Sequence, residues 1–188
     1  DVVQRQDLNL GLTEPSSARL AHELARLPGV LSLEPSRHAA VRIHFQGRSR
    51  QIGLRSLIPG SMHSRAVDHS GREIHPPSDG LIVSAKLAEV LGAQPGDLLV
   101  VEALEGRRPV KTLPLVGLAE DFTGIAAYME LHAINRFLGE GDVITGASLG
   151  LDLSRRGEFL AALKEIPRVS SVAIKETMRQ SFRETTAQ

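Results

Sequence analysis

The sequence predicts an α+β protein in which two similar strand–helix–strand segments, one near each end of the chain, enclose a β-rich insert. Three observations predict this arrangement: apolar residues alternate near each end, a similar proline-containing phrase follows each alternation, and short strand patterns broken by glycine and proline fill the middle. At 188 residues the chain can bury a sizeable core, as one domain or as two small ones.

The first strand–helix–strand segment lies in residues 8–33. Apolar side chains alternate over residues 8–12, which predicts a half-buried strand that residues 13–15 end. A helix capped by Ser16 or Ser17 then runs to about Leu27, because its leucines recur on one helical face. Residues 28–29, Pro-Gly, stop the helix, and a second strand opens at Val30.

The same order of signals returns in residues 147–172. A strand over 147–151 precedes a helix that Ser154 caps and Pro167 stops, and a further strand follows. Aligning Pro28 with Pro167 sets an offset of 167 − 28 = 139, at which the apolar positions of the two segments coincide. Because each segment needs a partner to cover its face, we expect one split, ferredoxin-like sheet. The alternative is that the two segments are unrelated, because any strand–helix–strand unit can arrive at this spacing.

The predicted sub-domains are therefore residues 1–46 plus 146–188, a discontinuous sheet sub-domain, and residues 47–145, an inserted β-rich sub-domain. In the middle of the chain we expect a hairpin over 41–57, a surface loop over 61–80, and strands over 98–104 and 110–116. Two short helices complete it, one after Ser84 and one over about 130–138. The polar tail beyond Val172 is compatible with a helix leading out of the domain.

Composition excludes several classes of function. Lys and Arg balance Asp and Glu at 22 each and aromatic residues make up only 3%, so neither the charge nor the stacking platforms of a nucleic-acid binder are present. The absence of cysteine rules out disulfides and thiolate chemistry. No apolar run is long enough for a membrane span, and the first residues do not form a signal peptide.

Four patterns were tested for chemistry. Residues 146–150 match Gly-x-Ser-x-Gly, but Ser148 falls inside a predicted strand rather than in a strand-to-helix turn. Adjacent carboxylates such as 120–121 point in different directions, and neither glycine-rich phosphate loop occurs. The spacing of six residues between loop histidines fixes no metal geometry; these histidines and the carboxylates near them are His63, His69, His75, Asp68, Glu73 and Asp79. We therefore expect no catalytic residue, no cofactor and no metal ion.

Within the insert, residues 81–104, LIVSAKLAEVLGAQPGDLLVVEAL, give the clearest prediction of secondary structure. A buried strand, a capped helix, a left-handed glycine and a Pro-Gly-Asp turn follow one another, and each residue type has a structural reason. In combination they resemble the extracytoplasmic domain of ABC transporter permeases of the MacB and FtsX type. The resemblance covers nearly the whole chain, and its phrase is matched at Ser84, Leu87, Ala88, Leu91, Gly92, Gly96 and Asp97.

The resemblance implies a non-enzymatic part of a transport machine. In such permeases ATP is hydrolysed by a separate cytoplasmic subunit, and the extracytoplasmic domain passes the motion of the membrane helices to a substrate or partner protein. It also implies a split sub-domain, called the porter in the family, and a second permease copy or homologue as partner. No motif identifies a substrate-contact residue. A free-standing periplasmic binding or adaptor module remains an alternative, and a metal-dependent hydrolase is another.

Overall fold

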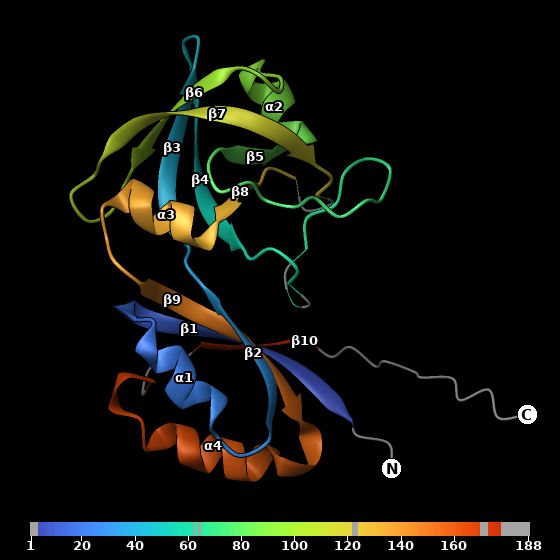
Figure 1. Ribbon diagram of the computed structural model, residues 1–188, viewed down its shortest axis with the longest axis vertical. Helices are drawn as coiled ribbons and strands as arrows, with labels where there is room; N and C mark the ends of the chain where they lie inside the picture. The colour runs from blue at the N-terminus through green and yellow to red at the C-terminus, as the bar shows by residue number, and fades with distance from the viewer. Residues whose placement is uncertain (1–3, 62, 64, 122–123, 170–172, 178–188) are drawn as a thin grey trace, which may run out of the picture. The chain divides into compact units, whose positions relative to one another are not determined.

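A computed structural model describes residues 4–61, 63, 65–121, 124–169 and 173–177 (Figure 1). The chain divides into two units, residues 1–35 with 144–188 and residues 36–143. Strands and helices are interspersed along the chain, and each α-helix comes after a strand. Each unit has its own hydrophobic core, because the two main clusters of buried side chains fall one in each unit.

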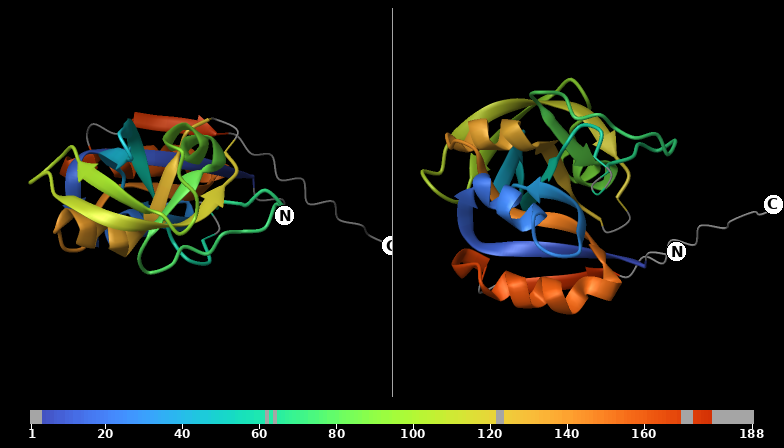
Figure 2. Two further views of the ribbon diagram at one scale, coloured as in Figure 1. Left: turned by 90° about the horizontal axis from the view of Figure 1, so that it is seen from above. Right: turned by 60° about the horizontal axis from the view of Figure 1, so that its bottom comes forward.

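The first unit is built on a four-stranded sheet in the order β10-β1-β9-β2. Its strands are β1 (Arg5–Ser17), β2 (Val30–Ser36), β9 (Val143–Asp152) and β10 (Ala173–Thr177). Helix α1 (Arg19–Ala25) follows β1, and α4 (Arg156–Lys164) follows β9 through a single 3-10 turn. Both helices lie on one face of the sheet (Figure 2). Their apolar sides form one core with that face, including Leu8, Leu24, Leu149, Leu151 and Phe159.

The two central strands bring equivalent positions of the two strand–helix–strand segments together. Ser148 donates a hydrogen bond to Oδ1 of Asn9 at 2.8 Å, and these residues are 139 positions apart. The Leu153 amide donates to the Gln4 carbonyl, so β1 and β9 run antiparallel. A residue that meets its own counterpart across two antiparallel strands marks a local two-fold relation between the segments.

The second unit is a closed barrel with the strand order β3-β4-β8-β5-β7-β6. Strands β4 and β8 pair in parallel, as do β5 and β7, whereas β3 with β4, β3 with β6, β5 with β8 and β6 with β7 are antiparallel. The strands are β3 (Ala39–Phe45), β4 (Arg48–Leu57), β5 (Leu81–Ser84), β6 (Leu98–Ala103), β7 (Val110–Ala119) and β8 (Ala127–Glu130). Helix α2 (Ala85–Leu91) follows β5, and α3 (Leu131–Leu138) follows β8.

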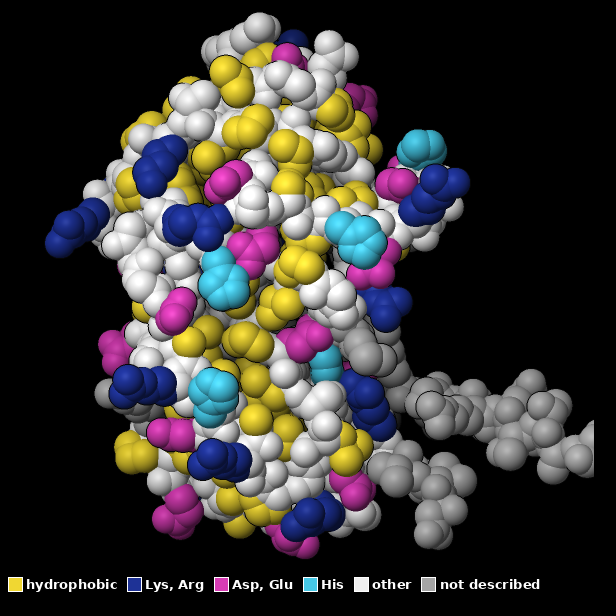
Figure 3. All heavy atoms as spheres, in the orientation of Figure 1, with side chains coloured by type: hydrophobic (Ala, Val, Ile, Leu, Met, Phe, Trp, Pro, Cys, Tyr) yellow, Lys and Arg dark blue, Asp and Glu magenta, His cyan; other side chains and the backbone are white. Residues whose placement is uncertain are grey.

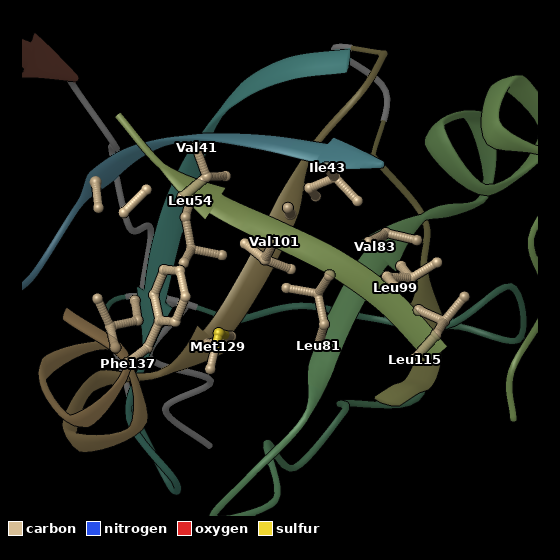
Figure 4. Packing of buried hydrophobic residues seen from close by; sticks show 14 of the residues in the cluster. Val41, Ile43, Leu54, Leu81, Val83, Leu99, Val101, Leu115, Met129 and Phe137 are labelled. Atoms are coloured by element: carbon tan, nitrogen blue, oxygen red, sulfur yellow. The ribbon is translucent and has the colours of Figure 1, made fainter. Parts of the chain in front are cut away.

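Aliphatic side chains fill the barrel, as the low aromatic content of the sequence requires (Figure 4). Alternate residues of β3 and β6, such as Val41, Ile43 and Val101, point inward and have no solvent exposure. Phe137 of α3 and Met129 of β8 pack against the same cluster. The barrel thus has a packed interior made chiefly of Leu, Val and Ile.

The barrel is itself built from a repeated order of elements. Strands β3, β4 and β5 lead into α2, and β6, β7 and β8 lead into α3. The last residue of β5 and of β8 caps the helix that follows: Ser84 accepts from the Leu87 amide, and Glu130 from the Ala133 amide. Each helix ends at a left-handed glycine, with φ of 71° at Gly92 and 69° at Gly139.

Several details differ from the sequence-based expectations. Neither α1 nor α4 has a side-chain hydrogen bond at its N-cap, so the expected serine caps are wrong, and residues 173–177, in the tail expected to be compatible with a helix, form β10. Residues 39–45, expected in the 1–46 part of the sheet sub-domain, form β3 and lie in the barrel because they pair with β4 and β6. Residues 13–15 do not end the first strand, since β1 continues to Ser17. Strand β8 was not predicted, because its four buried residues show no alternation. The tail over 178–188 lies outside the described residues.

Candidate functional site

The chain passes between its two units twice, after residue 35 and after residue 143. The first connection continues strand β2, which ends at Ser36, and the second is the start of β9 at Val143. These two strands are neighbours in the sheet of the first unit. Any force carried along the backbone between the units must pass through these two adjacent strands. The barrel residues that hold the two connections are therefore the candidate functional site.

Arg37 holds the first connection. Its side chain has no solvent exposure, and its backbone amide donates to Ser56 Oγ at 2.9 Å. The guanidinium donates from Nη2 to Oε1 of Glu105 at 3.1 Å and to Oε2 of Glu140 at 3.0 Å. It also donates from Nη1 to the His38 carbonyl at 2.6 Å. A buried charge needs such compensation, since a guanidinium removed from water is otherwise strongly destabilising.

Glu140 and Asn135 hold the second connection. Glu140 lies three residues before Val143, so its ion pair with Arg37 ties the two connections to each other within the barrel unit. Asn135 is buried on α3 and donates from Nδ2 to the Val143 carbonyl at 3.1 Å, while the Glu140 amide donates to the Asn135 carbonyl at 2.9 Å. We call Arg37, Glu105, Glu140 and Asn135 the crossing anchor.

The geometry of the crossing anchor is suited to fixing the positions of its members. Its two carboxylates are 37% and 32% exposed, and both are paired with the same buried guanidinium. Among the described residues, no group of three or more histidine or carboxylate side chains is placed to hold a metal ion. The arrangement therefore neutralises a buried charge and fastens two segments of backbone.

A second polar cluster lies at the end of strand β8. Tyr128 donates its hydroxyl proton to Oδ2 of Asp121 at 2.6 Å, and Nη1 of Arg55 lies 3.7 Å from the same oxygen. Tyr128 is 8% exposed and packs in a small apolar cluster with Leu57 and Ile82. Burial, together with the hydrogen bond and the negative charge of Asp121, raises the pKa of Tyr128 from its ordinary 10.0 to about 12.

The structure does not bring the sequence-predicted candidates into a reactive arrangement. Ser148 binds Asn9, and its neighbour Gly150 leaves room for the Arg5 guanidinium, whose Nε lies 2.7 Å from where a Cβ would be. Gly150, the second glycine of the Gly-x-Ser-x-Gly match, thus lies where a side chain would crowd Arg5 and Ser32.

The predicted loop histidines and carboxylates also remain apart. Asp68 accepts bonds from Ser70 and Arg72 in a turn, while His69 and His75 are exposed. Of the acidic pair 120–121, Glu120 is exposed and Asp121 binds Tyr128. No helix within the described residues has the length and apolar character that a membrane crossing requires.

Sequence reasoning missed the crossing anchor. Arg37 stands beside other polar residues in the sequence, and nothing local marks it as buried. Glu140 follows Gly139 in a phrase, Leu-Gly-Glu-Gly-Asp, that resembles the Leu-Gly-Ala-Gln-Pro-Gly-Asp phrase after α2. That likeness could have indicated the barrel repeat, though not the ion pair.

Tyr128 is the only tyrosine of the chain and there is no tryptophan, so its ionisation can be followed directly by absorbance. We expect a titration midpoint of about 12 in the folded protein. Because the folded pKa lies above the unfolded one, this group's contribution to stability is complete below pH 10.0 and is lost as pH rises through about 12. Asp121→Asn should lower the midpoint and Arg55→Gln should raise it. Equal midpoints in native protein and in urea would contradict the burial of this hydroxyl.

The crossing anchor predicts an asymmetry between its members. Replacing both Glu105 and Glu140 by Gln leaves a buried guanidinium without a counter-charge and should lower the free energy of unfolding by about 3–5 kcal/mol. Arg37→Met should cost less, because the two carboxylates left behind are partly exposed and can be hydrated. Urea unfolding followed by Tyr128 fluorescence measures both, with the exposed Arg48→Met as control. A larger loss for Arg37→Met than for the double variant would refute this account.

Solved structures of other proteins share this fold, although the sequences differ widely. No family model and no curated protein matches the sequence. The extracellular domain of the noncanonic ABC-type transporter YknZ from Gram-positive bacteria superposes with a TM-score of 0.55 at 13% identity, covering 93% of this chain and 100% of that one. The periplasmic region of MacB from Actinobacillus actinomycetemcomitans gives 0.57 at 10% identity, covering 92% and 88%.

At these identities the likeness establishes the fold. The chain has the mixed α/β fold of the extracellular domain of the ABC-type transporter YknZ and of the periplasmic region of MacB. This agrees with the resemblance inferred from residues 81–104.

Proposed function

We propose that this chain is the extracytoplasmic domain of an ABC transporter permease, and that it transmits ATP-driven motion of the membrane helices to a substrate or partner protein outside the cytoplasm. The observation that carries the proposal is the fold shared with the YknZ and MacB domains over more than nine-tenths of the chain. The domain itself performs no catalysis in this proposal. ATP hydrolysis occurs in a separate cytoplasmic subunit, and a second permease copy or homologue completes the membrane part.

The crossing anchor supports a transmitting role. Motion of the first unit that is carried along the backbone enters the barrel through β2 and β9, because the chain crosses between the units there. The ion pair between Arg37 and Glu140 keeps these two connections together on the barrel. A displacement of the paired strands would then move the whole closed barrel as one body.

We further infer that the first unit is a ferredoxin-like, porter-type sub-domain and that residues 36–143 are its insert. The order β10-β1-β9-β2, with one helix after β1 and one after β9, supports this interpretation. The contact between Asn9 and Ser148 supports it as well, since two equivalent halves would meet there. In this proposal the first unit lies next to the membrane part of the protein.

Two other functions have less support. A free-standing periplasmic binding or adaptor module would share the fold but would lack flanking membrane spans. A metal-dependent hydrolase would need histidines and carboxylates to converge, and among the described residues they do not. The full reading frame separates the first two, because apolar segments of about 20 residues directly before Asp1 and after Gln188 are required by the permease and absent from the module.

The proposal predicts that ATP changes the exchange of backbone amides in this domain. In the full-length permease reconstituted with its ATP-binding subunit, hydrogen–deuterium exchange of residues 28–36 and 138–144 should differ with and without ATP, because β2 and β9 carry the motion. A subunit that binds but cannot hydrolyse ATP is the control for turnover. Exchange unaffected by either nucleotide state would remove the transmitting role.

A further inference from the structure

The outer face of strands β6 and β7 carries an exposed apolar surface. Inward-pointing residues of these strands fill the barrel, so their outward neighbours face solvent. Leu98 is 62% exposed, Val110 59%, Val116 42% and Val100 38%. Leu98 pairs with the exposed Pro114, which joins the apolar surface across the two strands, while Val110 lies opposite Glu102 and is separated from Pro114 by the exposed Thr112. We call Leu98, Val100, Val110, Pro114 and Val116 the β6–β7 face.

Positive charge borders one end of the β6–β7 face. Arg107 and Arg108 are exposed in the turn that joins the two strands, and Pro109 separates them from Val110. Figure 3 shows Lys and Arg side chains gathered at this end of the barrel, beside the hydrophobic side chains over β7. Arg42 on the neighbouring β3 adds a third cation; the anions among them are Glu102 and Glu105, and Glu105 is paired with the buried Arg37. The border therefore has an excess of positive charge.

The barrel does not need these side chains for its own packing. Four aliphatic side chains remain 38–62% exposed and so forgo part of the stabilisation that their burial would give. Isolated exposed apolar residues are ordinary, whereas a contiguous apolar surface with a charged border is typical of an interaction site. A stable dimer uses roughly 20–30 residues from each partner, so a face of this size suits a smaller contact.

We propose that the β6–β7 face binds a protein segment that presents apolar side chains followed by carboxylates. The apolar side chains of the segment would cover Leu98, Val100 and Val116, and its carboxylates would pair with Arg107 and Arg108. The charge of the border favours an acidic partner and opposes a basic one. This inference rests on the proposed function only in placing the partner outside the cytoplasm.

The test uses the 188-residue chain and three model peptides, followed by amide chemical shifts in NMR spectra. One peptide alternates leucine with threonine and ends in a run of glutamates, the second ends in lysines, and the third has serine in place of leucine. We expect the first peptide to shift the amides of β6 and β7 and to bind at least tenfold more tightly than the other two.

Variants separate local recognition from net charge. Arg107→Gln with Arg108→Gln should weaken binding of the first peptide about tenfold, as should Leu98→Ser. Arg48→Gln with Arg50→Gln removes the same charge from exposed positions of β4 and should leave binding unchanged. Equal weakening by both charge pairs would reduce the effect to net charge and overturn the proposal.

Other occupants give different results. Binding of phosphatidylglycerol vesicles through this face, with no preference among peptides, would replace the protein segment by a lipid surface. Concentration-dependent self-association through β6 and β7 would replace it by a second copy. Absence of any shift at these strands would also overturn the inference. A failure of the ATP-dependent exchange experiment would leave the peptide result unaffected, so the two proposals can fail separately.

Discussion

A guanidinium that is wholly removed from water must keep its counter-charges, and the organisation of this protein depends on that requirement at Arg37. The side chain stands where the chain enters the barrel, and one of its two carboxylate partners stands where the chain leaves it. Loss of the pairing would leave a buried charge that is costly enough to unfold many small domains. The two connections between the units are thereby kept together without any covalent bond between them.

Each unit is built from two copies of a similar segment, which explains how a sequence poor in aromatic residues forms two packed cores. In the first unit, two strand–helix–strand segments share one sheet and meet at Asn9 and Ser148. In the second, two runs of three strands and a helix close a barrel whose parallel pairs, β4 with β8 and β5 with β7, correspond to each other. Each half covers the apolar face that the other exposes, so neither needs a large aromatic core.

The sequence alone predicts the features that depend on residues close together in the chain. The Ser84 cap, the left-handed Gly92 and the hairpin of β3 and β4 follow from residues close together in the chain. Strand β8 escaped prediction because a strand buried on both faces has no alternation, and β3 was assigned to the wrong unit because alternation does not reveal a strand's partners. The burial of Arg37 was not predicted for a related reason: its partners Glu105 and Glu140 lie 68 and 103 positions away in the sequence.

The most direct test of the central claim compares the response of the barrel to ATP in two forms of the reconstituted transporter, the wild type and Arg37→Met. The account predicts that ATP alters amide exchange of residues 36–38 and 138–143, where the two connections join the barrel, in the wild type, and that Arg37→Met abolishes this response while ATP hydrolysis and the Tyr128 titration of the folded barrel are retained. An equal response of the barrel in both forms would contradict the claim that the crossing anchor carries the motion.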